Sequence, residues 1–165
     1  PPSTAHPKRP FLGFASKRRE VSGTRLWGLI REFHPDPRTF LARQTVLNFI
    51  PLLVFDAEGR NLTPPQWPAA WRKDVERICG RMVATLARQW HPERFVAVGS
   101  YVAGALRACG TGVPVVDIPH PSPASPLANR GWREITLQRL HEQGVVADLL
   151  GMAALGDPVL RDKED

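Results

Sequence analysis

The sequence predicts a three-layer α/β/α protein with a mostly parallel central sheet. Two observations lead to this prediction. Short apolar segments with the composition of buried strands alternate with segments of helical periodicity, which is typical of parallel sheets covered by helices. The 165 residues, of which 42% are hydrophobic, are enough for one sizeable core but too few for two ordinary domains. We therefore expect one domain over residues 1–150 and a loose polar tail over residues 151–165.

The N-terminal third is predicted to contain a basic arm, two helices and a strand. Residues 1–20 are rich in Pro, Lys and Arg without periodicity, so we expect an extended arm or loop. Apolar side chains then recur at helical spacing, which predicts a helix from a cap at Ser22 to about Phe33. A shorter helix is expected over residues 38–43. Residues 45–55 (TVLNFIPLLVF) are apolar almost throughout, which predicts a strand covered on both faces.

The middle of the chain is predicted to contain a turn and a long helix. Residues 56–60 have the composition of a turn, and Thr63 followed by Pro64 is typical of a helix start. Residues 68–90 are expected to form an amphipathic helix. Its predicted core stripe consists of Trp71, Val75, Ile78, Met82 and Leu86.

The C-terminal part contains a strand–turn–helix–strand pattern followed by a helix. The predicted segments are a strand over 94–98, a turn at Gly99-Ser100, a helix over 101–109, a strand over 113–118 and a helix from a cap at Asn129 to Gly144. In parallel sheets, ligands bind beyond the carboxyl ends of the strands. Three segments stand at such strand ends and are therefore candidates for one site: the Asn48 region, Gly99-Ser100 and the segment from His120 to Pro123.

The positive charge of the chain is concentrated at its N-terminal end. The formal net charge is +6, and residues 1–43 contain nine Lys/Arg against three Asp/Glu, whereas the rest of the chain is neutral. Such a one-sided basic region favours a polyanionic partner, because contact with phosphates releases counterions. Lys8 and Arg9 are therefore candidate contacts for such a polyanion, with an ordinary solvated basic surface as the alternative.

Cysteine and histidine spacing gives no indication of a metal site. Cys79 and Cys109 are the two cysteines, and no Cys-x-x-Cys or Cys/His ligand pattern occurs. We expect reduced, buried thiols, with no disulfide, metal or organic cofactor. No apolar run approaches the 18 or so residues of a membrane span, so no membrane association is expected.

The segment PHPSPASPLANRGW, residues 119–132, is the most unusual in the chain. Its prolines follow a histidine at the end of a predicted strand, and they restrict the backbone to a nearly fixed shape. A rigid loop suits a wedge that is pressed into a DNA duplex and unstacks its bases. The alternative is an ordinary connection from a strand to a helix.

Residues 120–132 are similar to the second catalytic motif of the single-strand-selective monofunctional uracil-DNA glycosylases. In that family a His-Pro-Ser-Pro run precedes Ala-Asn-Lys-Gly-Trp. Further segments resemble the family in the same order: HPKRPFLG (6–13), EVSGTRLWG (20–28), VLNFIPLLVF (46–55), GRNLTP (59–64) and LQRLHEQGVVADLL (137–150). The resemblance covers nearly the whole chain and implies a uracil-DNA glycosylase-like α/β fold.

The resemblance also implies roles for particular residues. His120 is the expected catalytic histidine, which donates to uracil O2 as negative charge develops on the departing base. Asn48 is expected to recognise the base, because an amide can accept from uracil N3–H and donate to O4. The expected wedge consists of Pro121, Ser122, Pro123, Ala124, Ser125 and Pro126. Backbone N–H groups at Gly99 and Ser100 are expected to hold a phosphate.

The sequence departs from the family pattern at three places. Ala124 and Ser100 stand where family members often have a basic residue, which implies a weaker hold on DNA. The family also has a Gly-Met-Asn-Pro-Gly-Pro segment after a central strand, upstream of the region matched here, which orients the attacking water. These 165 residues contain no such segment, so we expect this chain alone to be inactive. The alternative function is that of a non-catalytic DNA-binding remnant.

A hydrolase triad is the second alternative, because Ser100, Asp117 and His120 occur in the chain order of α/β-hydrolases. The required G-x-S-x-G is absent, and Asp117 and His120 share one strand end, which argues against it. The favoured prediction is a monofunctional uracil-DNA glycosylase without a lyase step, acting on uracil in single-stranded and duplex DNA. A monomer is expected, located inside the cell: in the nucleus of a eukaryote, or in the cytoplasm or nucleoid of a bacterium.

Overall fold

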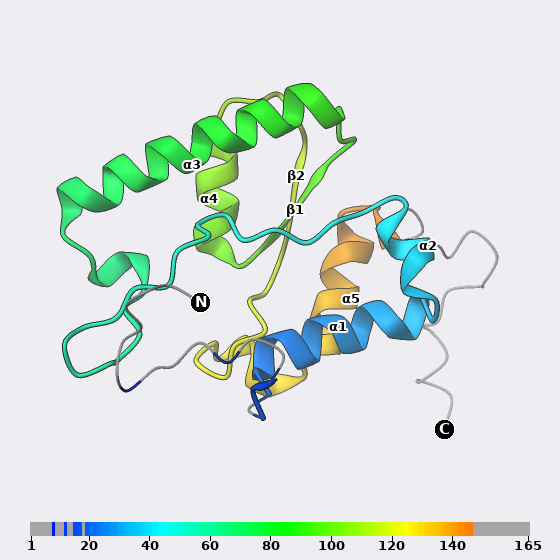
Figure 1. The fold of residues 1–165 in the computed structure, drawn as a ribbon. Coiled ribbons are helices and arrows are strands. Elements are labelled where there is room, and N and C mark those ends of the chain that lie inside the picture. The colour runs from blue at the N-terminus through cyan, green and yellow to red at the C-terminus, as the bar shows by residue number, and fades with distance from the viewer. Residues whose placement is uncertain (1–7, 9–11, 13–14, 18, 147–165) are drawn as a thin grey trace.

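The fold is known from a computed structural model, which describes residues 8, 12, 15–17 and 19–146. Arg9 and the tail expected over residues 151–165 lie outside the described residues. In chain order the elements are α1 (Val21–Phe33), α2 (Pro37–Leu41), the 3-10 helix η2 (Pro64–Gln66), α3 (Ala69–Trp90), β1 (Phe95–Val98), α4 (Ser100–Ala108), β2 (Val115–Ile118), the 3-10 helix η3 (Leu127–Arg130) and α5 (Trp132–Glu142) (Figure 1).

Strands β1 and β2 form a parallel pair connected by α4, which confirms the predicted strand–turn–helix–strand unit. Val96 lies opposite Val116, and Val98 lies opposite Ile118. Because side chains alternate between the faces of a sheet, these four valine and isoleucine side chains share one face. Ala97 points to the other face, where it is fully buried.

Helices cover both faces of the strand pair (Figure 1). On one face α1 and α5 pack against β2 around the core residues Leu29, Val116, Ile118, Ala128, Trp132, Leu137, Leu140 and Val145. On the other face α3 and α4 pack around Phe49, Trp67, Val75, Cys79, Val83, Ala97, Ala103 and Leu106. The α/β class and its layered arrangement are therefore confirmed for the described residues. None of the described helices is long and apolar enough to cross a membrane.

The strand predicted over residues 45–55 is wrong. The segment is extended, but its only pairing in the described part of the chain is an isolated antiparallel bridge between Phe55 and Asn61. Leu52 and Leu53 are more than half exposed, while Phe49 is buried against the α4 side of the core. An apolar composition predicts burial, but a strand also needs a neighbour that accepts its backbone hydrogen bonds. The described residues provide such a neighbour at one position.

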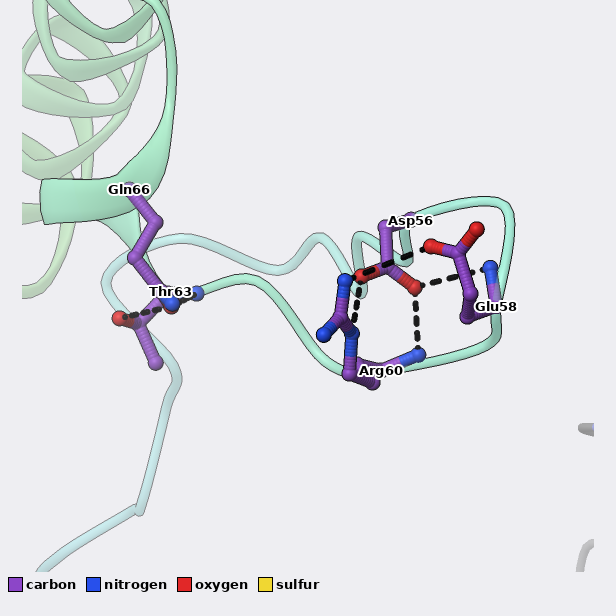
Figure 2. A network of polar contacts seen from close by, with 5 residues as sticks. All are labelled: Asp56, Glu58, Arg60, Thr63 and Gln66. Atoms are coloured by element: carbon purple, nitrogen blue, oxygen red, sulfur yellow. Dashed lines mark hydrogen bonds and ion pairs between the residues drawn. The ribbon is translucent and has the colours of Figure 1, made fainter.

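The turn predicted over residues 56–60 is confirmed and is held by one carboxylate (Figure 2). Asp56 Oδ1 accepts from the backbone N–H groups of Glu58 at 3.0 Å and Arg60 at 2.8 Å. Arg60 Nε donates to Asp56 Oδ2 at 2.6 Å. Three residues later, Gln66 Oε1 accepts from Thr63 N at 2.8 Å and caps η2. The GRNLTP segment thus joins a closed turn to a capped helix start.

The helices begin where expected within a few residues, but three details of the prediction are wrong. Glu20, not Ser22, caps α1, and Gly131, not Asn129, stands before α5. The predicted core stripe of α3 is rotated: Val75 is buried, but Trp71, Ile78 and Met82 are exposed. Cys79 and Val83 take the core positions instead, because α4 approaches α3 from that side.

Candidate functional site

The candidate site lies where β1 and β2 end. Gly99 follows β1 directly, and His120 stands two residues after β2. The two residues are in contact: a Cβ built on Gly99 would lie 3.1 Å from His120 Cβ and 3.3 Å from His120 Cδ2. Gly99 has φ 98° and ψ 151°, a conformation that is essentially restricted to glycine. The glycine therefore allows the histidine to lie directly against the start of α4.

A backbone donor fixes the imidazole of His120. Ser122 N–H donates to His120 Nδ1 at 3.1 Å. A ring nitrogen that accepts a hydrogen bond carries no proton, so in the neutral ring the proton is on Nε2. His120 is exposed, and its Nε2–H is therefore a donor at the surface of the site.

The loop around His120 is held by three side chains that each donate to a proline carbonyl. Trp132 Nε1 donates to Pro119 O at 2.8 Å, Arg25 Nη1 to Pro121 O at 2.8 Å, and Asn129 Nδ2 to Pro123 O at 2.7 Å. Proline has no N–H and its φ is fixed, so the remaining backbone freedom is mainly rotation about ψ. The hydrogen bonds to the carbonyls restrict this rotation. These hydrogen bonds are consistent with the rigidity predicted for this loop, which stays a prediction.

The loop buries its base and exposes its tip. Pro121 is buried, and Ser122 and Ser125 are half-buried, whereas Pro123, Ala124 and Pro126 are exposed. Two further hydrogen bonds shape the tip: Ala124 N donates to Ser122 Oγ at 3.2 Å, and Ser125 N donates to Ser122 O at 2.9 Å. The geometry is that of a stiff surface projection beside His120.

The first turn of α1 lies close to His120. Partial burial raises the pKa of the Glu20 carboxyl, but hydrogen bonds from Ser22 and Gly23 outweigh it, so the pKa lies below its ordinary value. Glu20 Oε1 accepts from Ser22 N at 3.0 Å, and Glu20 also accepts from Gly23 N. The Glu20 carboxylate therefore caps α1 at the end of the helix nearest His120.

Helix α4 presents its N-terminus at the same place. Gly99 has no side chain to cap it, and among the described residues no side chain forms a cap hydrogen bond to its first turn. The N–H of Gly99 itself donates to Ile118 O at 2.8 Å, so the free backbone donors begin at Ser100. Tyr101 packs edge-on against Phe49 with ring centroids 6.5 Å apart, and its hydroxyl donates to Glu76 at 2.7 Å. Partial burial and this contact with Glu76 raise the pKa of Tyr101.

Asn48 is placed by its neighbour Phe49. Because Phe49 contacts the first turn of α4, the segment that carries Asn48 passes the same end of α4 as Gly99 and His120. Asn48 itself is exposed. Lys8 of the basic arm is also exposed.

The arrangement does not form a hydrolase triad. Asp117 Oδ1 accepts from Arg107 Nη2 at 2.8 Å, and His120 Nδ1 accepts from Ser122 N instead of facing a carboxylate. In the described part of the chain, no group of His, Cys, Asp or Glu is arranged to hold a metal ion. Cys79 is buried and Cys109 half-buried, both as free thiols, and burial raises their pKa.

Sequence reasoning does not find the residues that support the site. The sequence identifies Arg25 only as one of the basic residues that favour a polyanionic partner, Asn129 only as a helix cap, and Trp132 only as part of a motif. The motif resemblance is the available signal, because Asn129 and Trp132 lie in the ANRGW segment and Arg25 in EVSGTRLWG.

Comparison with known proteins confirms the resemblance found in the sequence. No family model matches the chain. The chain is 36% identical over 149 residues to a single-strand-selective monofunctional uracil-DNA glycosylase of Bos taurus, covering 88% of this chain and 55% of that protein. Proteins of the same description from Rattus norvegicus and Mus musculus are 37% and 36% identical over 88% of this chain, with 54% and 53% of their own lengths covered. The chain thus spans about half the length of the curated relatives that it matches.

Proposed function

From the family to which these relatives assign the chain, the single-strand-selective monofunctional uracil-DNA glycosylases, we propose that the complete gene product removes uracil from DNA. The reaction hydrolyses the N-glycosidic bond and initiates base excision repair. Water adds to C1′ of the deoxyribose, the electron pair of the C1′–N1 bond leaves with the base, and a proton from the water balances the released uracil. The products are an abasic site and free uracil.

The observation that carries the proposal is the state of His120. Because Ser122 N–H occupies Nδ1, the neutral ring offers Nε2–H to a ligand. A donor fixed in advance stabilises the negative charge that collects on uracil O2 as the bond breaks. A donor that acts on developing charge accelerates the bond-breaking step more than it strengthens binding.

Asn48 is the proposed base reader. Its exposed amide lies on the segment that passes the N-terminus of α4. A base rotated out of the DNA duplex would contact the amide there. An amide matches uracil by accepting from N3–H and donating to O4, whereas cytosine has the opposite groups at these positions. A site built on such a pair disfavours cytosine, because its groups would stay unpaired.

DNA contact is proposed at three places. The loop of residues 121–126 fills, with its exposed tip, the gap that the base leaves in a duplex. The backbone N–H of Ser100 holds a phosphate at the N-terminus of α4, whereas the N–H of Gly99, expected to share this role, already donates to Ile118 O at 2.8 Å. The basic arm around Lys8 and Arg9 adds attraction to the DNA backbone. Single-stranded and duplex DNA are both proposed substrates, and 5-substituted uracils are further candidates to be assayed beside uracil.

The test is the replacement His120→Ala in the complete gene product. We expect single-turnover cleavage of uracil DNA to slow on the order of 100-fold to 1000-fold, as for loss of one well-placed donor, while DNA affinity stays nearly unchanged. Ser122→Ala is the matched control, since it keeps the N–H that holds the imidazole and alters the loop tip. It should affect cleavage of duplex more than of single-stranded substrate.

Two results would count against the proposal. Parental rates in His120→Ala on both substrates would show that this loop is not catalytic. A complete gene product that binds uracil DNA but does not cleave it would instead support the alternative of a non-catalytic DNA-binding remnant.

A further inference from the structure

One peptide group connects Arg25 to the imidazole of His120. The carbonyl of Pro121 accepts from Arg25 Nη1 at 2.8 Å, and the N–H of Ser122 donates to His120 Nδ1 at 3.1 Å. The Pro121 carbonyl and the Ser122 N–H belong to the same peptide unit, which is planar and rigid. A contact that fixes the direction of the carbonyl therefore also fixes the direction of the N–H.

The backbone beside this peptide group leaves few other ways to orient it. The ring of Pro121 fixes φ, so the plane of the Pro121–Ser122 peptide is set mainly by ψ of Pro121. Pro121 is buried, and its carbonyl receives a charged donor from a half-buried arginine. Hydrogen bonds with a charged partner are shorter and stronger than neutral ones.

Arg25 comes from a different element, 96 positions earlier in the chain than Pro121. It lies on the second turn of α1, whose N-terminus is fixed by Glu20 through Ser22 and Gly23. Gly23 permits this approach, since a Cβ there would lie 2.9 Å from Glu20 Oε2. Leu29 of the same helix is buried in the core with Ile118 and Trp132. The arginine thus starts from a well-anchored helix.

We propose that Arg25 is a positioning residue for His120: by holding the Pro121 carbonyl it aims the Ser122 N–H at Nδ1, and so keeps the proton on Nε2 and the ring facing the base. This role rests on the proposed glycosylase function. Without Arg25, the peptide plane can rotate, Nδ1 loses its donor, and the imidazole exchanges between tautomers and orientations.

The first experiment is a double-mutant cycle in the complete gene product. At saturating enzyme, Arg25→Ala should slow single-turnover cleavage of single-stranded uracil DNA on the order of 10-fold to 100-fold, the effect of a modest misplacement of a reacting group. In the His120→Ala background the same replacement should change the rate less than about 2-fold, because coupled residues are not additive. Arg25→Lys keeps a charged donor and should recover part of the rate.

The matched control is Glu32→Ala. Glu32 lies on the same helix and accepts from Arg133 Nε at 2.9 Å, so its replacement loosens α1 from α5 without touching the loop. It should lower the melting temperature and leave the saturating cleavage rate unchanged. An equal slowing in Glu32→Ala and Arg25→Ala would overturn the proposal, since the effect would then be a general loosening of α1.

The second experiment observes His120 without using activity. The ring ¹⁵N resonances of His120 should report a proton on Nε2 in the parent and in Glu32→Ala, and a mixture of tautomers in Arg25→Ala. Where Arg25→Ala does not fold, Arg25→Gln takes its place in both experiments. Parental ring resonances in the Arg25 variants would overturn the proposal.

The outcomes separate this proposal from the one on which it rests. A parent that does not cleave uracil DNA overturns the glycosylase function, while the resonances still decide whether Arg25 orients the ring.

Arg25 and Asn129 also line a surface groove of about 610 Å³ between α1 and α5. If Arg25 instead bound a phosphate from that groove, Arg25→Ala would weaken DNA binding, keep the saturating rate and keep the ring resonances, and the proposal would fail.

Discussion

Replacing Gly99 with alanine tests whether the contact between α4 and His120 is required. The added methyl must occupy a φ of 98° and ψ of 151°, and strain in this region costs about 1–3 kcal/mol. The methyl would also lie 3.1 Å from His120 Cβ and 3.3 Å from Cδ2, so the histidine must move by a few tenths of an ångström. Gly99→Ala should therefore both destabilise the fold and displace the imidazole.

Gly104→Ala is the matched control for this replacement. Gly104 lies in the same helix and is exposed, and a methyl group added there would have nothing within 4 Å. Alanine in an exposed helix interior is favoured over glycine by roughly 0.5–1 kcal/mol, so this variant should be slightly more stable than the parent. The two replacements, both in or next to α4, should therefore change the stability of the fold in opposite directions.

The assay combines thermal unfolding with single-turnover cleavage by the complete gene product. For a chain of this size, each kcal/mol shifts the melting temperature by about 2–4 °C, so the pair of variants should differ measurably. Cleavage should slow in Gly99→Ala at temperatures where the protein is fully folded and stay parental in Gly104→Ala. A Gly99→Ala protein with parental melting temperature and cleavage rate would refute the reasoning about this contact.

The remaining predictions concern the base, the backbone of DNA and pH. Asn48→Asp replaces the donor that we propose to face uracil O4 with a carboxylate oxygen, so uracil excision should drop sharply; single-turnover rates within a few-fold of the parent would show that Asn48 does not contact the base. Neutralising Lys8 and Arg9 together should weaken DNA binding and reduce its dependence on salt, measured as affinity over a salt series, and an unchanged slope would remove the arm from the interface. The hydrogen bond from Arg133, with its charge, outweighs partial burial and holds the pKa of Glu32 below its ordinary value. The stability from this pair is present above the unfolded pKa and lost as pH falls through the folded one, so Glu32→Gln should be destabilising in denaturant titrations at pH 7 and nearly neutral well below about pH 4; equal effects at both pH values would contradict the ion pair.

Local signals are enough to predict the part of the fold that carries the site. The strand–turn–helix–strand unit is predicted correctly because Gly99 marks the turn and the apolar segments on either side are short and uniform. The same information places Gly99 and His120 at one edge, and the structure brings them into contact. These features depend on residues close together in the chain, where periodicity and turn chemistry are informative.

Features that depend on a partner elsewhere are predicted less well. Residues 45–55 have the composition of a buried strand, yet Leu52 and Leu53 are exposed, because composition does not say which strand would pair with them. For α3, both Ile78 and Cys79 fit an apolar stripe, and the position of α4 decides that Cys79 is buried. When a helix has apolar residues on several sides, the elements that pack against it decide which of these side chains are buried.

Arg25 shows why a charge count cannot assign function to single residues. In the sequence it is one of the basic residues of the N-terminal region and equally suited to DNA. In the structure its guanidinium donates to the Pro121 carbonyl, whose peptide group also holds His120. Residues 20–28 and 120–132, two segments that resemble the glycosylase family, therefore contact each other at the peptide group that also donates to the imidazole.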